Sequence, residues 1–116
     1  MCGILIAGTG SASAITYLMG GNYEQVVNTI KTMCSNLTGM MCDGAKQGCA
    51  LKVYSGVSAA VQAALLSMRG IKTNNDGIIE DDIEKTIRNV GLIGTAGMEQ
   101  TDRTILEIMT QKEGKN

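Results

Sequence analysis

The sequence predicts an all-α fold: a compact bundle of about five helices separated by glycines. Three observations support this prediction. Apolar residues recur every three to four positions, and no convincing segment alternates apolar and polar residues as a half-buried strand does. The chain has 15 glycines and no proline, a composition that suits uninterrupted helices ending at glycine. With 116 residues, 44% of them apolar, residues 1–116 are expected to form a single domain with a core.

The first helix is expected over residues 4–19, an uncharged apolar stretch that ends at Gly20-Gly21. Glycine, serine and threonine interrupt this stretch, and it is too short to cross a membrane. A second helix should follow Asn22, an N-cap whose capping box Gln25 completes. The second helix is expected to end at Gly39. Its apolar residues at helical spacing are Val26, Ile30, Met33 and Leu37, with Val27, Cys34 and Met41 beside them in the pattern.

A third helix should begin near Cys49 and end at Gly70. Its apolar stripe consists of Leu51, Tyr54, Val57, Val61, Leu65 and Met68. After a polar turn at residues 72–77, a fourth helix is marked by Ile79, Ile83, Ile87 and Val90. The acidic residues 80–82 lie near its N-terminus, where the helix dipole favours them. The run 94–97 separates it from a fifth helix, which carries Ile105, Leu106 and Met109. The charged tail 112–116 is expected to fray.

The charge balance argues against several classes of partner. Ten basic and eleven acidic residues give a net charge of −1, and no basic stripe is present, so nucleic acid is not an expected partner. The chain has no histidine, which excludes acid–base chemistry and metal ligation by its own imidazoles. No signal peptide or membrane span is evident, and four cysteines without a secretion signal predict a cytoplasmic location with free thiols. The composition is compatible with a homo-oligomer.

Cys2, Cys42 and Cys49 are the candidate metal ligands. Cys42 and Cys49 are the first and last residues of a glycine-rich string, residues 42–49, that is typical of a loop rather than of a packed helix. Thiolates suit iron–sulfur clusters and zinc, and Cys49 would begin a helix, where the dipole favours a thiolate. From spacing alone, buried packing cysteines, a zinc site and a cluster all stay open. Cys34 falls on the apolar stripe of the second helix and is predicted to be a core residue.

The glycine-rich run of the first helix is a second candidate. At a helix start, it could hold a phosphate or a carboxylate on its backbone N–H groups. It lacks the third glycine of a dinucleotide fingerprint, no strand precedes it, and it lacks the lysine of a P-loop. Close helix packing is the alternative use of these residues, which are Gly8, Thr9, Gly10 and Ser11.

Charged residues of the cysteine-containing string are the remaining candidates. Lys46 and Lys52 could form a Schiff base with pyridoxal phosphate, but no phosphate cup or pyridinium partner is recognisable, so solvated or anion-binding lysines are favoured. Asp43 could bind a ligand, orient a thiolate or cap the third helix.

Residues 38–53 resemble the iron–sulfur serine dehydratase alpha-domain superfamily, and in particular its L-cysteine desulfidase branch. Residues 2–12 and 97–109 match the same branch, so the resemblance covers nearly the whole chain and is most specific at residues 42–49. The resemblance implies a [4Fe–4S] cluster held by Cys2, Cys42 and Cys49. It also implies a fourth iron that binds the amino-acid substrate, without pyridoxal phosphate.

Family enzymes of this kind remove the β-substituent of L-cysteine or L-serine. The products are pyruvate and ammonia, with hydrogen sulfide from cysteine. Cysteine desulfidase is the expected activity, and L-serine dehydratase is the alternative within the class. An alternative from another class is a non-catalytic helical module whose cysteines are buried or bind zinc. Candidate groups for contacting the substrate or supporting the cluster are Asp43, Lys46 and the run Gly8 to Ser11.

The resemblance also implies a longer enzyme. Family members have a long region before the equivalent of Cys2, which supplies other active-site residues, including the base. We therefore expect this chain to correspond to the C-terminal cluster-binding part of such an enzyme. The missing N-terminal region would be its partner, and catalysis would require both.

Overall fold

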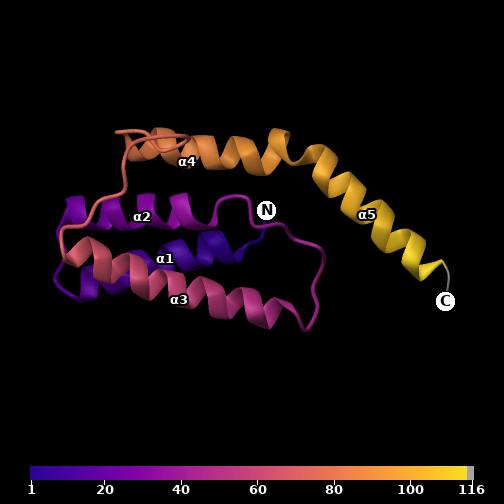
Figure 1. The fold of residues 1–116 in the computed structure, drawn as a ribbon, viewed down its shortest axis with the longest axis horizontal. Coiled ribbons are helices and arrows are strands. Elements are labelled where there is room, and N and C mark those ends of the chain that lie inside the picture. The colour runs from indigo at the N-terminus through magenta and orange to yellow at the C-terminus, as the bar shows by residue number, and fades with distance from the viewer. Residues whose placement is uncertain (115–116) are drawn as a thin grey trace.

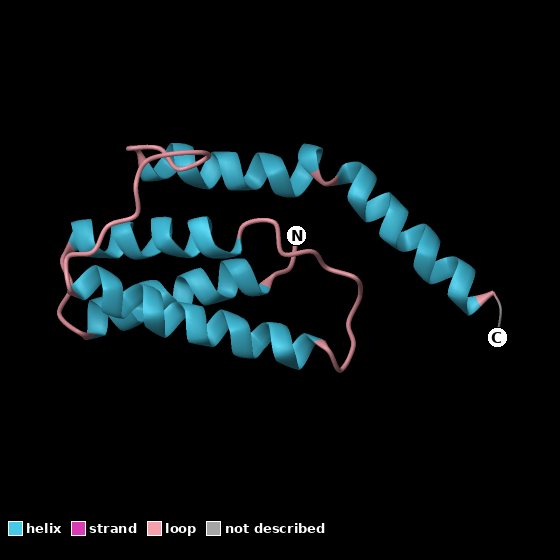
Figure 2. Ribbon diagram, viewed as in Figure 1, coloured by secondary structure: helices cyan, strands magenta, loops and turns pink. Residues whose placement is uncertain are grey.

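A computed structural model describes residues 1–114, which are helical along most of their length (Figure 1). The described residues contain no strand, so the all-α prediction is confirmed for them (Figure 2). The elements are α1 (Ile4–Leu18), α2 (Tyr23–Leu37), α3 (Cys49–Met68), α4 (Ile83–Leu92), the short π-helix η1 (Ile93–Gly97) and α5 (Glu99–Glu113).

Helices α1, α2 and α3 pack together as a bundle whose core is made mostly of small side chains. The core contains Ala12, Met33, Ala59, Ala60 and Ala63. Close approach of α1 to α3 depends on glycine, since a Cβ atom on Gly56 would collide with the side chain of Ile4. Such close packing replaces the bulky apolar residues that a core of this size would otherwise need.

The apolar stripe predicted for α3 lies mostly on its exposed face, and Met68 is its half-buried member. Leu51 and Tyr54 are each 73% exposed, and Val57 is 55% exposed. The buried face lies on the opposite side of the helix and carries Gly56, Ala59, Ala60, Ala63, Ala64 and Ser67. The prediction was wrong because it assumed that the largest side chains face the core, whereas α1 lies too close to α3 to leave room for them.

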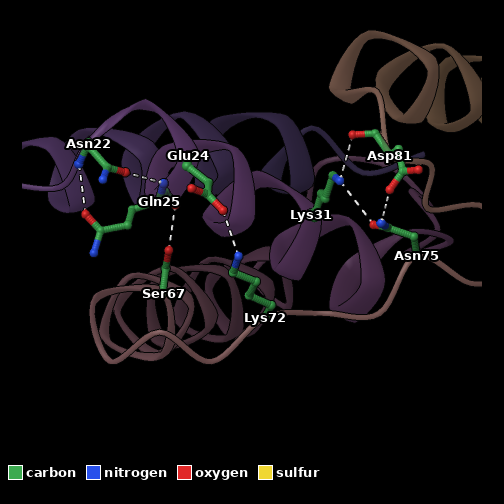
Figure 3. A network of polar contacts seen from close by, with 8 residues as sticks. All are labelled: Asn22, Glu24, Gln25, Lys31, Ser67, Lys72, Asn75 and Asp81. Carbon is green, nitrogen blue, oxygen red and sulfur yellow. Dashed lines mark hydrogen bonds and ion pairs between the residues drawn. The ribbon is translucent and has the colours of Figure 1, made fainter.

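Polar contacts fix the N-terminal end of α2 (Figure 3). The capping box is confirmed: the Asn22 side chain accepts from the Gln25 backbone N–H at 2.9 Å, and the Gln25 side chain accepts from the Asn22 N–H at 2.9 Å. The Ser67 hydroxyl donates to the Gln25 carbonyl at 2.6 Å and ties α3 to α2. The hydroxyls of Thr16 and Thr29 are 2.7 Å apart inside the bundle and link α1 to α2.

A long loop between α3 and α4 is anchored on Lys31 of α2. This lysine is 6% exposed, and its ammonium donates to Asn75 Oδ1 at 3.1 Å and to the Asp81 carbonyl at 2.9 Å (Figure 3). The Asn75 amide in turn contacts the Asp81 carboxylate. Because the buried Lys31 ammonium directly contacts only neutral oxygens, the loss of either hydrogen bond would leave the charge poorly compensated.

Replacing Lys31 by methionine should destabilise the chain by about 1–3 kcal/mol, because Asn75 and the Asp81 carbonyl lose a charged donor. Urea unfolding followed by circular dichroism measures the change. Lys72→Met is the control: its ion pair with Glu24, at 2.7 Å, joins two exposed side chains. The control should leave the unfolding midpoint unchanged, and equal effects of the two variants would contradict the anchoring role of Lys31.

Helix α4 begins later than predicted. Ile79 lies before the helix, where it is 5% exposed, and Asp82 caps α4 by accepting from the Glu84 N–H at 2.9 Å. The acidic residues 80–82 therefore precede the first turn. The run 94–97 lies between α4 and α5, as predicted, but it is itself helical and continues α4 as the π-helix η1.

Helix α5 extends away from the bundle and runs past the loop that joins α2 to α3 (Figure 1). It is helical through Glu113, so the predicted fraying does not include Lys112 or Glu113. The rest of the predicted fraying tail, at positions 115 and 116, lies outside the described residues.

Candidate functional site

The candidate site lies at one end of the bundle, where the loop of residues 38–48 joins α2 to α3 (Figure 1). The backbone N–H of Cys2 donates to the Met40 carbonyl at 2.7 Å, which holds the N-terminus against this loop. Cys42 lies within the loop, and Cys49 is the first residue of α3, as predicted. Two segments distant in sequence, the N-terminus and residues 38–49, thus bring the three predicted ligands to one end of the bundle.

The three thiols differ in exposure, and none of them forms a disulfide bond. Cys42 is exposed, Cys2 and Cys49 are half-buried, and all are free. The Cys49 thiol contacts the Gly44 carbonyl at 3.6 Å. Within residues 1–114, no three histidine, cysteine, aspartate or glutamate side chains are gathered closely enough to hold a metal ion. The ligand set therefore stays a prediction.

Cys34 is buried in the bundle, as predicted, at 5% exposure. Burial raises the pKa of the Cys34 thiol, which keeps this cysteine in its neutral form. It is therefore a natural internal control for the three cysteines of the site.

Asp43 links the two lysines of the loop region. Its carboxylate forms ion pairs with Lys46 and with Lys52, the latter at 3.4 Å. Lys52 also donates to the Met41 carbonyl at 2.6 Å, so it fastens the loop to α3. The proposed capping role of Asp43 is excluded, because the N-cap of α3 is Gly48 and no side chain caps it.

These contacts set the charges of the loop. The hydrogen bond from Lys46 lowers the pKa of Asp43, and Lys52 acts in the same direction. The pKa of Lys46 is raised, first by its hydrogen bond to Asp43 and further by the charges of Asp43, Cys49 and Cys42. Lys46 is therefore a permanent cation close to both cysteines of the string.

Replacing Lys46 by methionine should raise the pKa of Asp43 toward its ordinary range, and Lys52→Met should raise it less. In the unaltered chain, the ion pair is complete above the ordinary carboxyl range and is lost as pH falls through the lowered pKa. A titration of the Asp43 carboxyl carbon by NMR measures both values. A larger shift with Lys52→Met would contradict the dominant role of Lys46.

An open cavity of about 810 Å³ lies between the loop and α5. The loop side carries the charged groups Asp43, Lys46 and Lys52, and α5 contributes a largely apolar wall. The backbone at Gly44 has φ +94°, and a Cβ there would lie 2.8 Å from the Met109 terminal methyl. The other residues that line the cavity are Met40, Met41, Gly44, Ala45, Ile105, Ile108, Met109, Lys112 and Glu113. A small, zwitterionic or anionic molecule matches this combination of walls.

The glycine-rich run lies inside α1 and not at a helix start, so its backbone N–H groups are not free to hold an anion. Gly8 is buried, and a Cβ there would lie 3.2 Å from the Met33 terminal methyl, which confirms the packing alternative at this position. Thr9 and Gly10 line a different, apolar cavity of about 410 Å³ between α1, α2 and α4. Ser11 is exposed. Neither of these two cavities is lined by both the run and the cysteine loop.

Sequence reasoning missed the wall that α5 contributes. The sequence predicts only that Met109 and Ile105 are apolar residues of a helix, yet they face the loop across the cavity. Roughly sixty residues separate them from the loop, and neither residue type carries a local sequence signature for this contact.

The family model described as serine dehydratase alpha chain matches residues 1–107. The chain belongs to this family. The match includes the three candidate cysteines, the loop and the part of α5 that carries Ile105. The resemblance inferred from the sequence is thus confirmed at the level of the family.

Several bacterial relatives of this chain carry the name UPF0597 protein. The relative from Phocaeicola vulgatus is 51% identical over 114 residues, covering 97% of this chain and 26% of the relative. The relative from Bacteroides thetaiotaomicron is 50% identical over 115 residues, covering 98% of this chain and 27% of the relative. That from Parabacteroides distasonis is 52% identical over 113 residues, covering 97% and 26%. The chain therefore spans about a quarter of their length. No solved structure matches the chain.

Proposed function

We propose that this chain forms the cluster-binding part of a β-eliminating lyase that converts L-cysteine to pyruvate, ammonia and hydrogen sulfide. The observation that carries the proposal is the position of the cysteine loop, in a member of the serine dehydratase alpha chain family, on the wall of an open cavity with cationic groups. Because the chain spans about a quarter of its relatives, we assign the activity to a longer assembly. The family resemblance implies that this assembly includes an N-terminal region.

The donor chemistry fits a [4Fe–4S] cluster held by Cys2, Cys42 and Cys49. All three are free thiols at the same end of the bundle, and thiolates are the ligands that such clusters prefer. When bound, a cluster with three protein ligands would supply an iron that acts as a Lewis acid toward the leaving group.

The groups of the cavity can bind and orient an amino acid. The Lys46 ammonium can pair with the substrate carboxylate, while Asp43 and Lys52 hold the loop in place. On the opposite side, α5 contributes a largely apolar wall to the open cavity. Because the chain has no histidine, we assign the base that removes the α-proton to the N-terminal region.

Pyridoxal phosphate is not part of the proposal. A lysine that forms a Schiff base must first lose its proton, and the raised pKa of Lys46 opposes that step. Lys52 is engaged by Asp43 and the Met41 carbonyl. The location in the cytoplasm and a homo-oligomeric state remain predictions from the sequence.

The alternative within the class is L-serine dehydratase, which would use the same cavity with a hydroxyl leaving group. Pyruvate release from L-cysteine and from L-serine should be compared under anaerobic conditions, with the N-terminal region supplied in the same chain or as a second polypeptide. A higher kcat/KM for cysteine supports the desulfidase assignment, and a higher value for serine overturns it. Turnover by the 116-residue chain alone would contradict the assignment of the base.

The alternative outside the class is a non-catalytic helical module with zinc-binding or buried cysteines. Anaerobic reconstitution of the chain with iron and sulfide should yield a brown protein with the visible absorption of a [4Fe–4S] cluster. Preferential uptake of zinc, or no uptake by the folded chain, would contradict the cluster proposal. This measurement requires neither substrate nor the remaining part of the enzyme.

A further inference from the structure

The side of α3 that faces away from the bundle is apolar and exposed. Its five large side chains define what we call the outer α3 face: Leu51, Tyr54, Val57, Val61 and Leu65. Each of them is at least 41% exposed. No charged residue interrupts the sequence between Lys52 and Arg69. Because the opposite side of α3 is buried, this helix is apolar on two sides, a pattern typical of helices that are covered on both.

We propose that the outer α3 face is the docking surface for the part of the family's polypeptide that this chain lacks. The relatives match this chain along 97% of its length, yet about three-quarters of each relative lies outside the match. A polypeptide of that size is more than sufficient to cover one helix face. The inference rests on family membership and on exposure, and it is independent of the reaction assigned above.

A lipid bilayer is the competing occupant, since α3 is long and apolar enough to cross a membrane by length and composition. The bundle argues against it. The small residues of α3 pack directly against α1 and α2, and α2 carries Glu24 and the buried Lys31. Inserting α3 would therefore draw charged groups toward the bilayer or dismantle the core. Gln62, which is exposed within the helix, is a further polar group that a bilayer would have to accommodate.

The test uses the 116-residue chain and the unmatched three-quarters of the Phocaeicola vulgatus relative, co-expressed as two polypeptides. We expect a stable 1:1 complex. The variant Tyr54→Gln/Val61→Gln should weaken binding at least about tenfold, because a few large anchor side chains contribute most of the binding free energy of such interfaces. Leu106→Gln is the matched control: Leu106 is also exposed, at 63%, but lies on α5. It should change the dissociation constant less than about twofold.

Three results would overturn the proposal. The first is a complex that the two variants affect equally, and the second is no complex between well-folded polypeptides. The third is another occupant of the face. That occupant would be a second copy of the chain, seen as dimers in sedimentation equilibrium, or a lipid surface, seen as binding to vesicles of phosphatidylcholine and phosphatidylglycerol in equal amounts. In either case, Tyr54→Gln/Val61→Gln would abolish the association. Neither cluster incorporation nor turnover enters these measurements, so their failure is separate from failure of the proposed function.

A second measurement applies where the separate segment does not fold. In a chimera, this chain replaces the matched quarter of the Phocaeicola vulgatus relative, and hydroxyl-radical oxidation of Tyr54 is compared with that in the free chain. Tyr54 is 73% exposed in the free chain. Its oxidation should slow at least about fivefold in the chimera, as expected for a side chain buried on docking. Equal oxidation rates would overturn the proposal.

Discussion

Replacing Cys42 or Cys49 by alanine is expected to reduce the yield of reconstituted cluster more than about tenfold, since removing a direct ligand costs at least as much as disturbing an outer hydrogen bond. Cys2→Ala should have the same effect. With three protein ligands, loss of any one leaves only two thiolates to hold four irons. The measurement is iron and sulfide content per chain after anaerobic reconstitution, together with the visible spectrum.

Cys34→Ala is the control for this experiment. It also removes one thiol, but that thiol is buried, and its raised pKa keeps it neutral. The control variant should reconstitute nearly as well as the unaltered chain, provided that circular dichroism shows the same helix content. Equal losses with Cys34→Ala and Cys49→Ala would contradict a specific ligand set and would favour nonspecific uptake of iron by thiols.

The cysteine loop could be predicted from the sequence because its residues are contiguous. Residues 42–49 combine two thiols, glycines and opposite charges, a local pattern that indicates a loop. The start of α3 at Cys49 could be predicted because the loop pattern ends there. The pairing of Asp43 with Lys46 and Lys52 could not be predicted, since it depends on how the loop turns back over α3. The wall formed by α5 depends on the direction that η1 gives to the chain, which periodicity does not encode.

The start of α2 followed from its capping residues, whereas the identity of the buried faces did not follow from the sequence. Asn22 and Gln25 predicted the start of α2 because a capping box is a local arrangement. In α3 and α1, however, the interhelical distance decides which residues are buried. Gly8 and Gly56 allow the two helices to approach until only small side chains fit, so the large residues of α3 are left outside.

Replacing Gly56 by alanine should therefore destabilise the chain, although the same change in an open helix position is stabilising. At Gly10 of α1, a Cβ would meet no atom within 4 Å, so Gly10→Ala should stabilise the chain by about 0.5–1 kcal/mol. At Gly56, the added methyl collides with the Ile4 side chain, and overpacking of this kind costs about 1–3 kcal/mol. The two variants should thus differ by about 1.5–4 kcal/mol in free energy of unfolding.

The cause of that difference can be tested with a double-mutant cycle on Gly56 and Ile4. Ile4→Ala alone removes a half-buried side chain and should destabilise the chain. Combined with Gly56→Ala, it also removes the atoms with which the new Cβ collides, so the double variant should be more stable than the sum of the single effects predicts. Urea unfolding of the four proteins measures this coupling. Additive effects, or equal stability of Gly56→Ala and Gly10→Ala, would show that close packing of α1 on α3 does not determine which face of α3 is buried.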